Sequence, residues 1–182
     1  METMDGGWTA IQKRMNGSLS FEKNWDEYKN DFGSPEQDVW IGNDVIHHLT
    51  KDGDSSLYIS ITLVNDNRLY ELYDKFSISS EADKYQLFLA GPATGTLGDS
   101  MYNTGNSNND LSGMYFSTPD TDNDRLGGGN CAASHKGGWW FNSCHTTFLN
   151  GRWSPGFWQY PWFPTVMYGT SVKETVMMIR RH

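Results

Sequence analysis

The chain has 182 residues, a formal net charge of -8 and two cysteines. This length suits one domain with a substantial hydrophobic core. The acidic balance argues against nucleic acid and anionic membranes as partners, because those surfaces attract basic patches. No run of 18 apolar residues occurs, so no membrane insertion is expected, and no signal-peptide pattern follows Met1. We therefore expect a cytosolic protein or a piece of a secreted one.

The first half of the sequence has regular patterns. Residues 6–14, GGWTAIQKR, read as a strand, and Ser20 is a predicted N-cap for a helix over residues 21–32. That helix would place four aromatic side chains on one face: Phe21, Trp25, Tyr28 and Phe32. Residues 39–50, VWIGNDVIHHLT, predict the end of a strand and then a short helix. Further antiparallel strands are predicted over residues 56–65, 69–78 and 85–91.

The composition changes near residue 91. Glycine, asparagine, serine and aspartate then dominate with little periodicity, although tryptophan, phenylalanine and tyrosine are frequent after residue 138. Because disordered segments lack such an aromatic load, we expect ordered loops held by rings, a disulfide and an ion. Residues 171–182 predict a closing strand. The expected organisation is one domain, with a sheet and helix part (1–90), a loop-rich part (91–170) and that strand.

A carboxylate-rich loop precedes the first cysteine. Asp120, Asp122 and Asp124 alternate along it, and calcium takes several such oxygen ligands together with backbone carbonyls. The loop is not an EF-hand, because Arg125 and Cys131 stand where that motif needs glycine and glutamate. The glycines that follow favour a backbone that bends toward an ion. The pattern is compatible with a calcium site or with a solvated turn.

The two cysteines, Cys131 and Cys144, are compatible with a bridge, a metal pair or two buried thiols. Zinc is disfavoured, because no CxxC spacing and no second cysteine pair accompanies them. A disulfide is favoured, and it would indicate an oxidising compartment. Asn16 begins an N-glycosylation sequon, Asn-Gly-Ser, and is a candidate glycosylation site.

Seven segments resemble, in the same order, landmarks of the fibrinogen-like C-terminal domain shared by fibrinogen chains, ficolins, tachylectins, angiopoietins and tenascins. They are GGWTAIQKR, FEKNWDEYKNDFG, VWIGNDVIHHLT, LGDSM, FSTPDTDND, NCAASHKGGWWFNSCH and LNGRW. The resemblance covers almost the whole sequence. It implies an α+β fold, with a twisted antiparallel sheet, short helices and a loop-rich calcium- and ligand-binding subdomain. Family domains begin with a small disulfide-bonded subdomain that precedes the position of Met1, so the protein resembles a fragment or a shortened member.

The resemblance also implies a calcium site. Its ligands would be the carboxylates of Asp122 and Asp124 and the backbone carbonyls of Leu126 and Gly128. The loop has one more glycine than the usual pattern, so the carbonyl of Gly127 or Gly129 is an alternative ligand, and Asp120 would be an outer residue. The implied disulfide joins Cys131 to Cys144.

Lectin-type relatives bind acetyl groups beside that disulfide. The resemblance places Ser143, Cys144 and His145 on the pocket wall, with a cis peptide bond before Cys144 that turns two backbone N–H groups toward a ligand carbonyl oxygen. His135 stands where many such relatives have tyrosine. Tyr160 and Tyr168 are the further wall candidates, in a region that departs from the family pattern.

The function expected from this resemblance is calcium-dependent, lectin-like recognition of acetylated carbohydrates by a secreted, oligomeric protein of innate immunity. Its oligomer would form through regions outside this sequence. The alternative is an extracellular protein-binding module: a receptor ligand, a matrix element or an assembly protein. Fibrin-like assembly is disfavoured, because Ser134 and His135 occupy the places where the fibrin peptide pocket has acidic and amide groups. Enzymatic activity is not expected, because no activated nucleophile or paired acid and base is evident.

Overall fold

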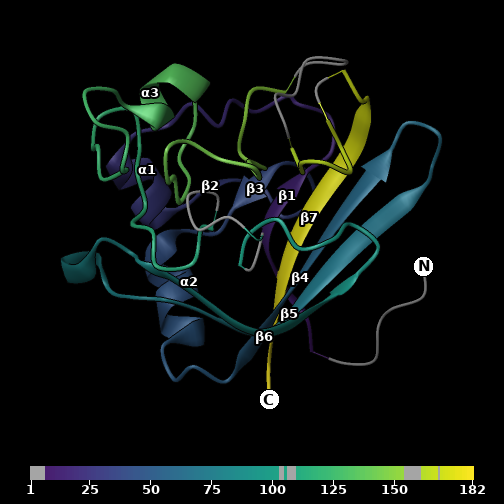
Figure 1. Ribbon diagram of the computed structural model, residues 1–182, viewed down its shortest axis with the longest axis horizontal. Coiled ribbons are helices and arrows are strands. Elements are labelled where there is room, and N and C mark those ends of the chain that lie inside the picture. Colours follow the sequence, from purple (N-terminus) through teal and green to yellow (C-terminus); the bar gives the residue numbers. More distant parts are fainter. Residues whose placement is uncertain (1–6, 103–104, 106–109, 154–160, 168) are drawn as a thin grey trace.

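The computed structural model describes residues 7–102, 105, 110–153, 161–167 and 169–182. Within them a seven-stranded antiparallel sheet runs in the order β2-β3-β1-β7-β4-β5-β6 (Figure 1). The strands are β1 (Thr9–Arg14), β2 (Phe32–Gly33), β3 (Val39–Trp40), β4 (Ser55–Leu63), β5 (Arg68–Ile78), β6 (Leu87–Gly95) and β7 (Val172–Arg181). The helices are α1 (Trp25–Asn30), α2 (Asn43–Thr50) and α3 (Cys131–His135), with a 3-10 turn at Glu81–Asp83. This is the α+β architecture that the sequence predicts.

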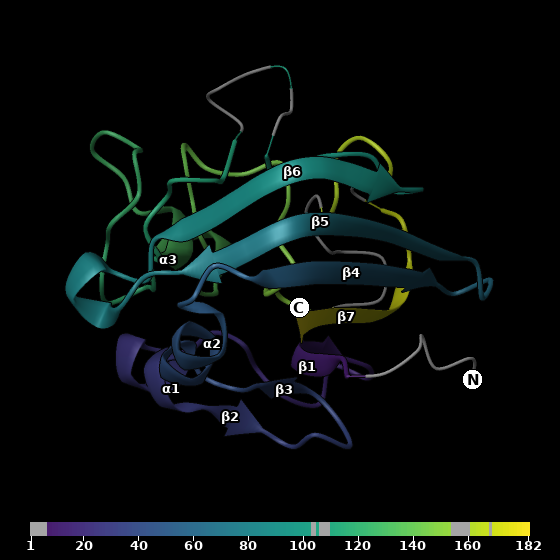
Figure 2. The same cartoon turned by 90° about the horizontal axis from the view of Figure 1, so that it is seen from below.

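Strand β7, predicted as the strand that closes the domain, lies inside the sheet between β1 and β4. Met178 of β7 pairs with Ala10 on one side and with Tyr58 on the other. Strands from the first and the last parts of the sequence therefore form one continuous sheet. Figure 2 shows this order from a second direction, with the short helices α1 and α2 beside β2 and β3.

Helix α1 is shorter than predicted, and the prediction of Ser20 as its N-cap is wrong. The helix begins at Trp25, and Asn24 caps it by accepting a hydrogen bond from the N–H of Glu27 at 2.9 Å. The Glu27 carboxylate accepts the N–H of Asn24 at 3.0 Å in return, which completes a capping box. The capping box therefore gives acceptors to the N–H groups of Asn24 and Glu27. Among the described residues, the Ser20 hydroxyl accepts the N–H of Glu22, which lies before the helix.

The aromatic side chains expected on one face of that helix pack together even though two of them lie outside it. The ring of Phe32 contacts the rings of Phe21 and Tyr28 edge-on, with centres 4.9 and 5.0 Å apart. A Cβ atom on Gly138 would stand 2.6 Å from the Tyr28 ring. Glycine at this position thus lets the loop-rich half of the molecule approach the helix closely.

The loop-rich half forms part of the same hydrophobic core as the sheet. Its fully buried large side chains include Phe116, Trp139, Trp140, Phe141, Phe148 and Trp162. Indole N–H groups in this core find backbone acceptors: Trp140 donates to the carbonyl of Tyr85 at 2.8 Å, and Trp162 to that of Gly98 at 2.7 Å. Rings and backbone hydrogen bonds together order these loops. In the described part of the molecule, no helix has the length and apolarity needed to cross a membrane.

Candidate functional site

The carboxylate-rich loop leads directly into α3. Asp124 joins the two, because its Oδ1 accepts the N–H of Leu126 and its Oδ2 accepts the N–H of Cys131, both at 2.7 Å. Asp122 contacts Asp124 through a hydrogen bond from the Asp124 N–H, 3.2 Å long. Asn130 then caps α3 by accepting from the N–H of Ala133 at 2.7 Å. The two carboxylates predicted as calcium ligands therefore lie together at the start of the helix that contains Cys131.

The charges in this loop favour a cation. Burial raises the pKa of the Asp124 carboxyl, the two backbone N–H groups lower it, and the negative charge of Asp122 raises it again. No group of three or more acidic, histidine or cysteine side chains gathers in the described residues, so an ion here needs backbone carbonyls as well. Gly128 has a positive φ of 81°, and the carbonyl of Leu126 accepts the N–H of Gly129 at 3.3 Å. The donor set of carboxylates and carbonyls fits calcium.

Asp120, expected as an outer residue of the calcium loop, has other partners. Its Oδ1 accepts the Thr118 hydroxyl at 2.7 Å and the backbone N–H of Trp25 at 3.0 Å. It therefore ties the loop to the first turn of α1, where a negative charge is also favourable.

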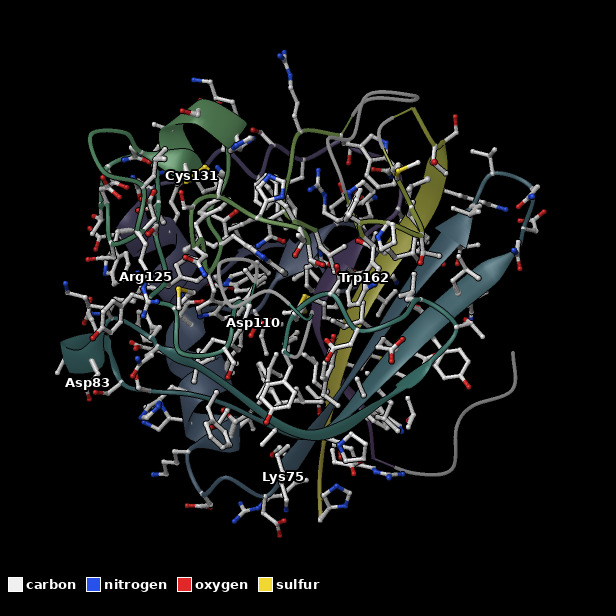
Figure 3. All side chains as sticks on the ribbon, viewed as in Figure 1. Lys75, Asp83, Asp110, Arg125, Cys131 and Trp162 are labelled. Atoms are coloured by element: carbon white, nitrogen blue, oxygen red, sulfur yellow. A yellow bond between two sulfur atoms is a disulfide. The ribbon has the colours of Figure 1, made fainter. Side chains whose placement is uncertain are left out.

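A disulfide joins Cys131 and Cys144 across a Cα–Cα distance of 5.6 Å. It connects α3 to the turn that contains Ser143, and the Ser143–Cys144 peptide bond is cis, as the resemblance implies. Two further hydrogen bonds hold the turn. The backbone N–H of Asn142 donates to the carbonyl of Cys144 at 2.8 Å, and the side-chain amide of Asn142 donates to the carbonyl of Asp110 at 3.0 Å. Figure 3 labels Asp110 and Cys131, the first residue of α3.

His135 and His145 form one end of an aromatic cluster beside the disulfide. Their ring centres are 4.6 Å apart, and Phe141 and Phe148 pack against both rings. Burial, and to a smaller extent the neighbouring His135, lowers the pKa of His145 to about 3. The buried Nδ1 of His145 has no hydrogen-bond partner in the described residues. His145 is therefore neutral at physiological pH.

Two backbone donors stand at this turn. Among the residues that the structure describes, none accepts a hydrogen bond from the N–H of Cys144 or from that of His145. Ser143 is exposed, and Cys144 and His145 are partly exposed. His135, Ser143, Cys144 and His145 thus lie together, and their role as the wall of a ligand pocket stays a prediction. Tyr160 and Tyr168, the other predicted wall residues, lie outside the described residues.

The predicted glycosylation residue Asn16 is exposed in the turn after β1. Its side-chain oxygen accepts the N–H of Ser18 at 2.9 Å. The position is accessible, and glycosylation there stays a prediction.

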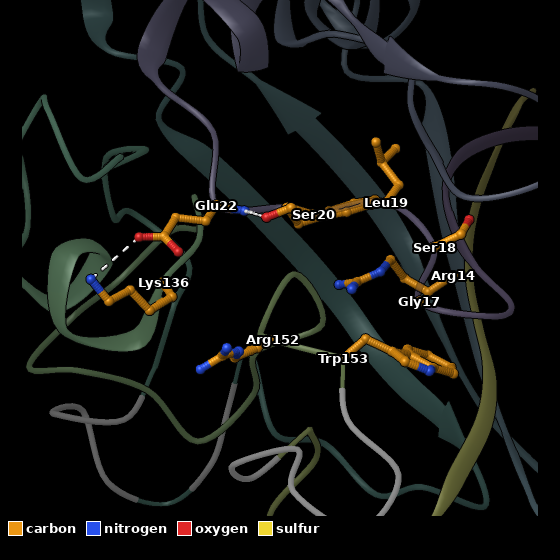
Figure 4. A pocket seen from close by; sticks show the side chains of 10 residues that line it. Arg14, Gly17, Ser18, Leu19, Ser20, Glu22, Lys136, Arg152 and Trp153 are labelled. Atoms are coloured by element: carbon orange, nitrogen blue, oxygen red, sulfur yellow. Dashed lines mark hydrogen bonds and ion pairs between the residues drawn. The ribbon is translucent and has the colours of Figure 1, made fainter.

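The structure also has a groove that contains Lys136 and Arg152, and the sequence did not indicate it. It is a groove of about 320 Å³ lined also by Arg14, Glu22 and Trp153 (Figure 4). These residues are far apart in the sequence and form no motif, so no sequence signal marked them.

The protein matches, over residues 1–182, the family model described as "Fibrinogen beta and gamma chains, C-terminal globular domain". It is 41% identical to fibroleukin of Bos taurus over 193 residues and 41% identical to fibroleukin of Homo sapiens over 194 residues. Each alignment covers 99% of this sequence and 43% of the relative, so the protein spans less than half the length of these relatives.

Several solved structures have the same fold as this protein. The fibrinogen-like globe domain of human ANGPTL2 superposes with a TM-score of 0.88 at 35% identity, covering 99% of this protein and 82% of that one. The corresponding domain of human ANGPTL6 gives 0.87 at 34%, covering 100% and 81%. A lamprey fibrin D-dimer complexed with the peptide Gly-His-Arg-Pro-amide gives 0.87 at 31%, covering 99% and 63%.

The sheet, the loop-rich half and the disulfide beside α3 thus define a fibrinogen-like globular domain. The protein belongs to the family formed by the C-terminal globular domains of the beta and gamma subunits of fibrinogen.

Proposed function

We propose that this domain is an extracellular, non-enzymatic binding module whose partner is a protein. The observation that carries the proposal is the pair of backbone N–H groups of Cys144 and His145, which bond to no described residue and lie at an exposed turn. Free backbone N–H groups on adjacent residues can donate to a carbonyl oxygen, and partner proteins present such oxygens along their backbone. The disulfide and the aromatic cluster hold the turn in place.

The chemistry around this turn favours a neutral hydrogen-bond acceptor. His145 remains uncharged at neutral pH, because burial lowers its pKa to about 3. Phe141 and Phe148 are fully buried beneath the turn, so the partly exposed rings of His135 and His145 are the aromatic surface that the site offers to a ligand. Ser134 and His135 stand where the resemblance implies acidic and amide groups in the fibrin peptide pocket, so the cationic peptide seen with lamprey fibrin is a poor candidate here, and we propose a different peptide segment as the ligand.

An acetylated carbohydrate is the second candidate, because an acetyl group presents the same carbonyl oxygen together with a methyl group for the rings. The exposed position of Ser143 and the contact between His135 and His145 are compatible with such a pocket. The protein partner has more support, since a fibrin relative of this fold is known with a bound peptide.

The disulfide supports secretion, because such bonds persist in oxidising compartments. A single small pocket binds weakly, so we also propose that several domains act together in an oligomer. That oligomer would form through parts of the protein outside this sequence.

A displayed library of random peptides, screened on the immobilised domain in millimolar calcium, tests the proposed function. Enriched peptides are expected to shift the amide resonances of Cys144 and His145 in NMR spectra. They should lose at least tenfold in affinity when Ser143→Trp covers the turn. Lys51→Trp, at an exposed position after α2, is the control and should keep the affinity.

N-acetylglucosamine and glucosamine are titrated in parallel. Shifts at the same two amides that need the acetyl group, without any peptide that causes them, would favour the carbohydrate ligand. If neither peptides nor sugars move these amides in the folded domain, the turn is not a binding site.

We further propose that calcium binds between Asp122 and Asp124, with the carbonyls of Leu126 and Gly128 or a neighbouring glycine. The close carboxylates and the raised pKa of Asp124 support this site. A bound cation would neutralise the carboxylates and fix the loop that leads to α3. It would thereby order the turn beyond the disulfide.

Asp124→Asn is expected to abolish calcium-dependent stabilisation. Extracellular sites often bind calcium with dissociation constants of about 0.1 to 1 mM. For the upper value, a calcium concentration of about 10 mM should stabilise the native domain by about 1.4 kcal/mol. The variant should also lose about 1 to 3 kcal/mol without calcium, because one buried N–H loses its acceptor. Thermal unfolding with calcium and with chelator measures both effects.

Asp120→Asn is the matched control, since Asp120 binds Thr118 and Trp25 instead of the loop interior. It should retain the calcium increment. An equal increment in wild type and Asp124→Asn would place the ion elsewhere.

A further inference from the structure

The groove that contains Lys136 and Arg152 lies between three segments of the protein. One side is the connection from β1 to α1, represented by Glu22, and another is the C-terminal end of α3, where Lys136 stands. Arg152 and Trp153 form the third side. Figure 4 shows the side chains of Arg152 and Lys136 along one edge, with Glu22 opposite Lys136. The cavity of about 320 Å³ is at the lower end of the range for small-ligand pockets, which begins at about 300 Å³.

The charge of this groove is opposite to that of the whole protein. Among the residues that the structure describes, three cationic side chains line it, those of Arg14, Lys136 and Arg152, and Glu22 is the single acidic lining residue. The protein as a whole has a net charge of -8. A basic groove on an acidic protein attracts negatively charged groups selectively.

Arg14 forms the floor of the groove and is itself structural. Its guanidinium lies 3.9 Å from the centre of the Phe21 ring and donates to the carbonyl of Gly151 at 2.8 Å. Burial lowers its pKa to about 10, so it remains charged at neutral pH, and its Nε lies 3.9 Å from a carboxylate oxygen of Asp38. Because Asp38 offsets this charge, Arg14 is not the group that captures a ligand.

Arg152 supplies the uncompensated charge. Its side chain is exposed, and within the described part of the molecule no hydrogen bond, ion pair or ring contact engages it. The guanidinium group is a planar donor that binds carboxylates through two parallel hydrogen bonds. Arg152 is therefore available to bind an anion that enters the groove.

Lys136 has an internal partner that a ligand can replace. Its ammonium lies 3.3 Å from a carboxylate oxygen of Glu22, and both side chains are about half exposed, at 52% and 49%. Exposed pairs of this kind contribute little to stability, about 0 to 1 kcal/mol. Glu22 thus occupies the position that a ligand carboxylate would take. Because the pair contributes little to stability, a ligand can displace Glu22 at little cost in free energy.

We propose that this groove binds the carboxylate of an acidic side chain from a partner protein, with Arg152 and Lys136 as the ligand-binding cations and Glu22 as the displaceable internal group. Charge complementarity argues for this occupant. Asp38 offsets the charge of Arg14 and Glu22 offsets that of Lys136, so the positive charge of Arg152 remains, and it matches one carboxylate. The choice of a protein partner rests on the proposed function, whereas the carboxylate recognition rests on the groove alone.

The test uses two small probes, Gly-Glu-Gly-amide and Gly-Gln-Gly-amide, which differ only in one carboxylate. The glutamate peptide is expected to shift the side-chain resonances of Arg152 and Lys136 in NMR titrations at low salt, and the glutamine peptide is not. Arg152→Ala should weaken binding of the glutamate peptide by about two- to fivefold, the range typical of one exposed charge pair. Glu22→Gln should strengthen it, because Lys136 loses its competing partner.

Arg68→Ala is the matched control, because Arg68 is an exposed arginine of β5 that pairs with Glu174 at 3.8 Å. This variant should leave the affinity unchanged. Equal binding of the two probes, or an equal loss in Arg68→Ala and Arg152→Ala, would overturn the proposal. Binding of glucuronate at Arg152 without binding of the glutamate peptide would overturn the choice of a protein. The side-chain resonances of Arg152 and Lys136 report on the groove, whereas the amide resonances of Cys144 and His145 report on the proposed function. Failure of one proposal can therefore be distinguished from failure of the other.

Discussion

Replacement of both cysteines by alanine is expected to lower the free energy of unfolding by about 3 kcal/mol in the chain-entropy model of a loop this short. The disulfide spans a sequence separation of 13 residues and joins the fully buried Cys131 to the partly exposed turn at Cys144. Without it the unfolded protein gains freedom, and the turn loses its covalent connection to α3. Denaturant unfolding of the variant and of the wild type measures the loss.

Hydrogen exchange at the turn separates this loss from a general weakening of the core. The amide of Asn142, which donates to the carbonyl of Cys144, is expected to exchange faster in the double variant, whereas strand amides of β4 and β7 should keep their order of protection. Alanine is used at Cys131 because a serine hydroxyl would be buried there. A loss of less than about 1 kcal/mol, well under the chain-entropy value, would mean that ring packing alone holds the turn.

His145→Phe is expected to reduce the loss of stability on acidification. The pKa of His145 is about 3 in the native domain, lowered mainly by burial and also by His135, and the ordinary value of 6.5 applies to the unfolded state. Between these pH values the unfolded state binds a proton that the native state does not. Stability is therefore lost as the pH falls from about 6.5 toward 3, with a slope of up to about 1.4 kcal/mol per pH unit from this residue.

Phenylalanine suits the position, because the ring of His145 packs against Phe141 and Phe148. Its buried Nδ1 has no hydrogen-bond partner in the part of the molecule that the structure describes. Urea unfolding between about pH 4.5 and about pH 7.5 gives the slope for wild type and variant, so that carboxylate contributions common to both cancel. His48→Phe, at an exposed position on α2, controls for replacing a surface histidine. Parallel pH curves for wild type and His145→Phe would show that His145 is solvated in the native state.

The long strand β4 was predictable because its side chains alternate, whereas β2 includes Phe32, which was predicted to be helical. In β4, the fully buried Leu57, Ile59 and Ile61 mark one face of the sheet, and this period of two is visible in the sequence. The helix boundary was not predictable from the aromatic spacing. Phe32 meets Phe21 and Tyr28 through tertiary packing, while local capping at Asn24 decides where α1 begins.

The candidate site was likewise predictable from the sequence in one part and not in another. Asp122, Asp124 and the cysteines are close in the sequence and resemble a family pattern, so their association was predictable. The contact between His135 and His145 depends on how the backbone folds back through the disulfide. The groove could not be predicted, because Glu22, Lys136 and Arg152 come from three distant segments and meet only in the folded domain.

The central position of β7 has a consequence for biosynthesis. Until residues 172–181 have left the ribosome, β1 and β4 lack the strand that lies between them, and the sheet remains in two parts. Both inner edges then present unpaired backbone groups, which are templates for wrong pairing between molecules. Completion of the sheet also requires contacts across most of the sequence, and such contacts form slowly. The two parts of the sheet can therefore join only after residues 172–181 have emerged, and until then the edges of β1 and β4 are sites for aggregation.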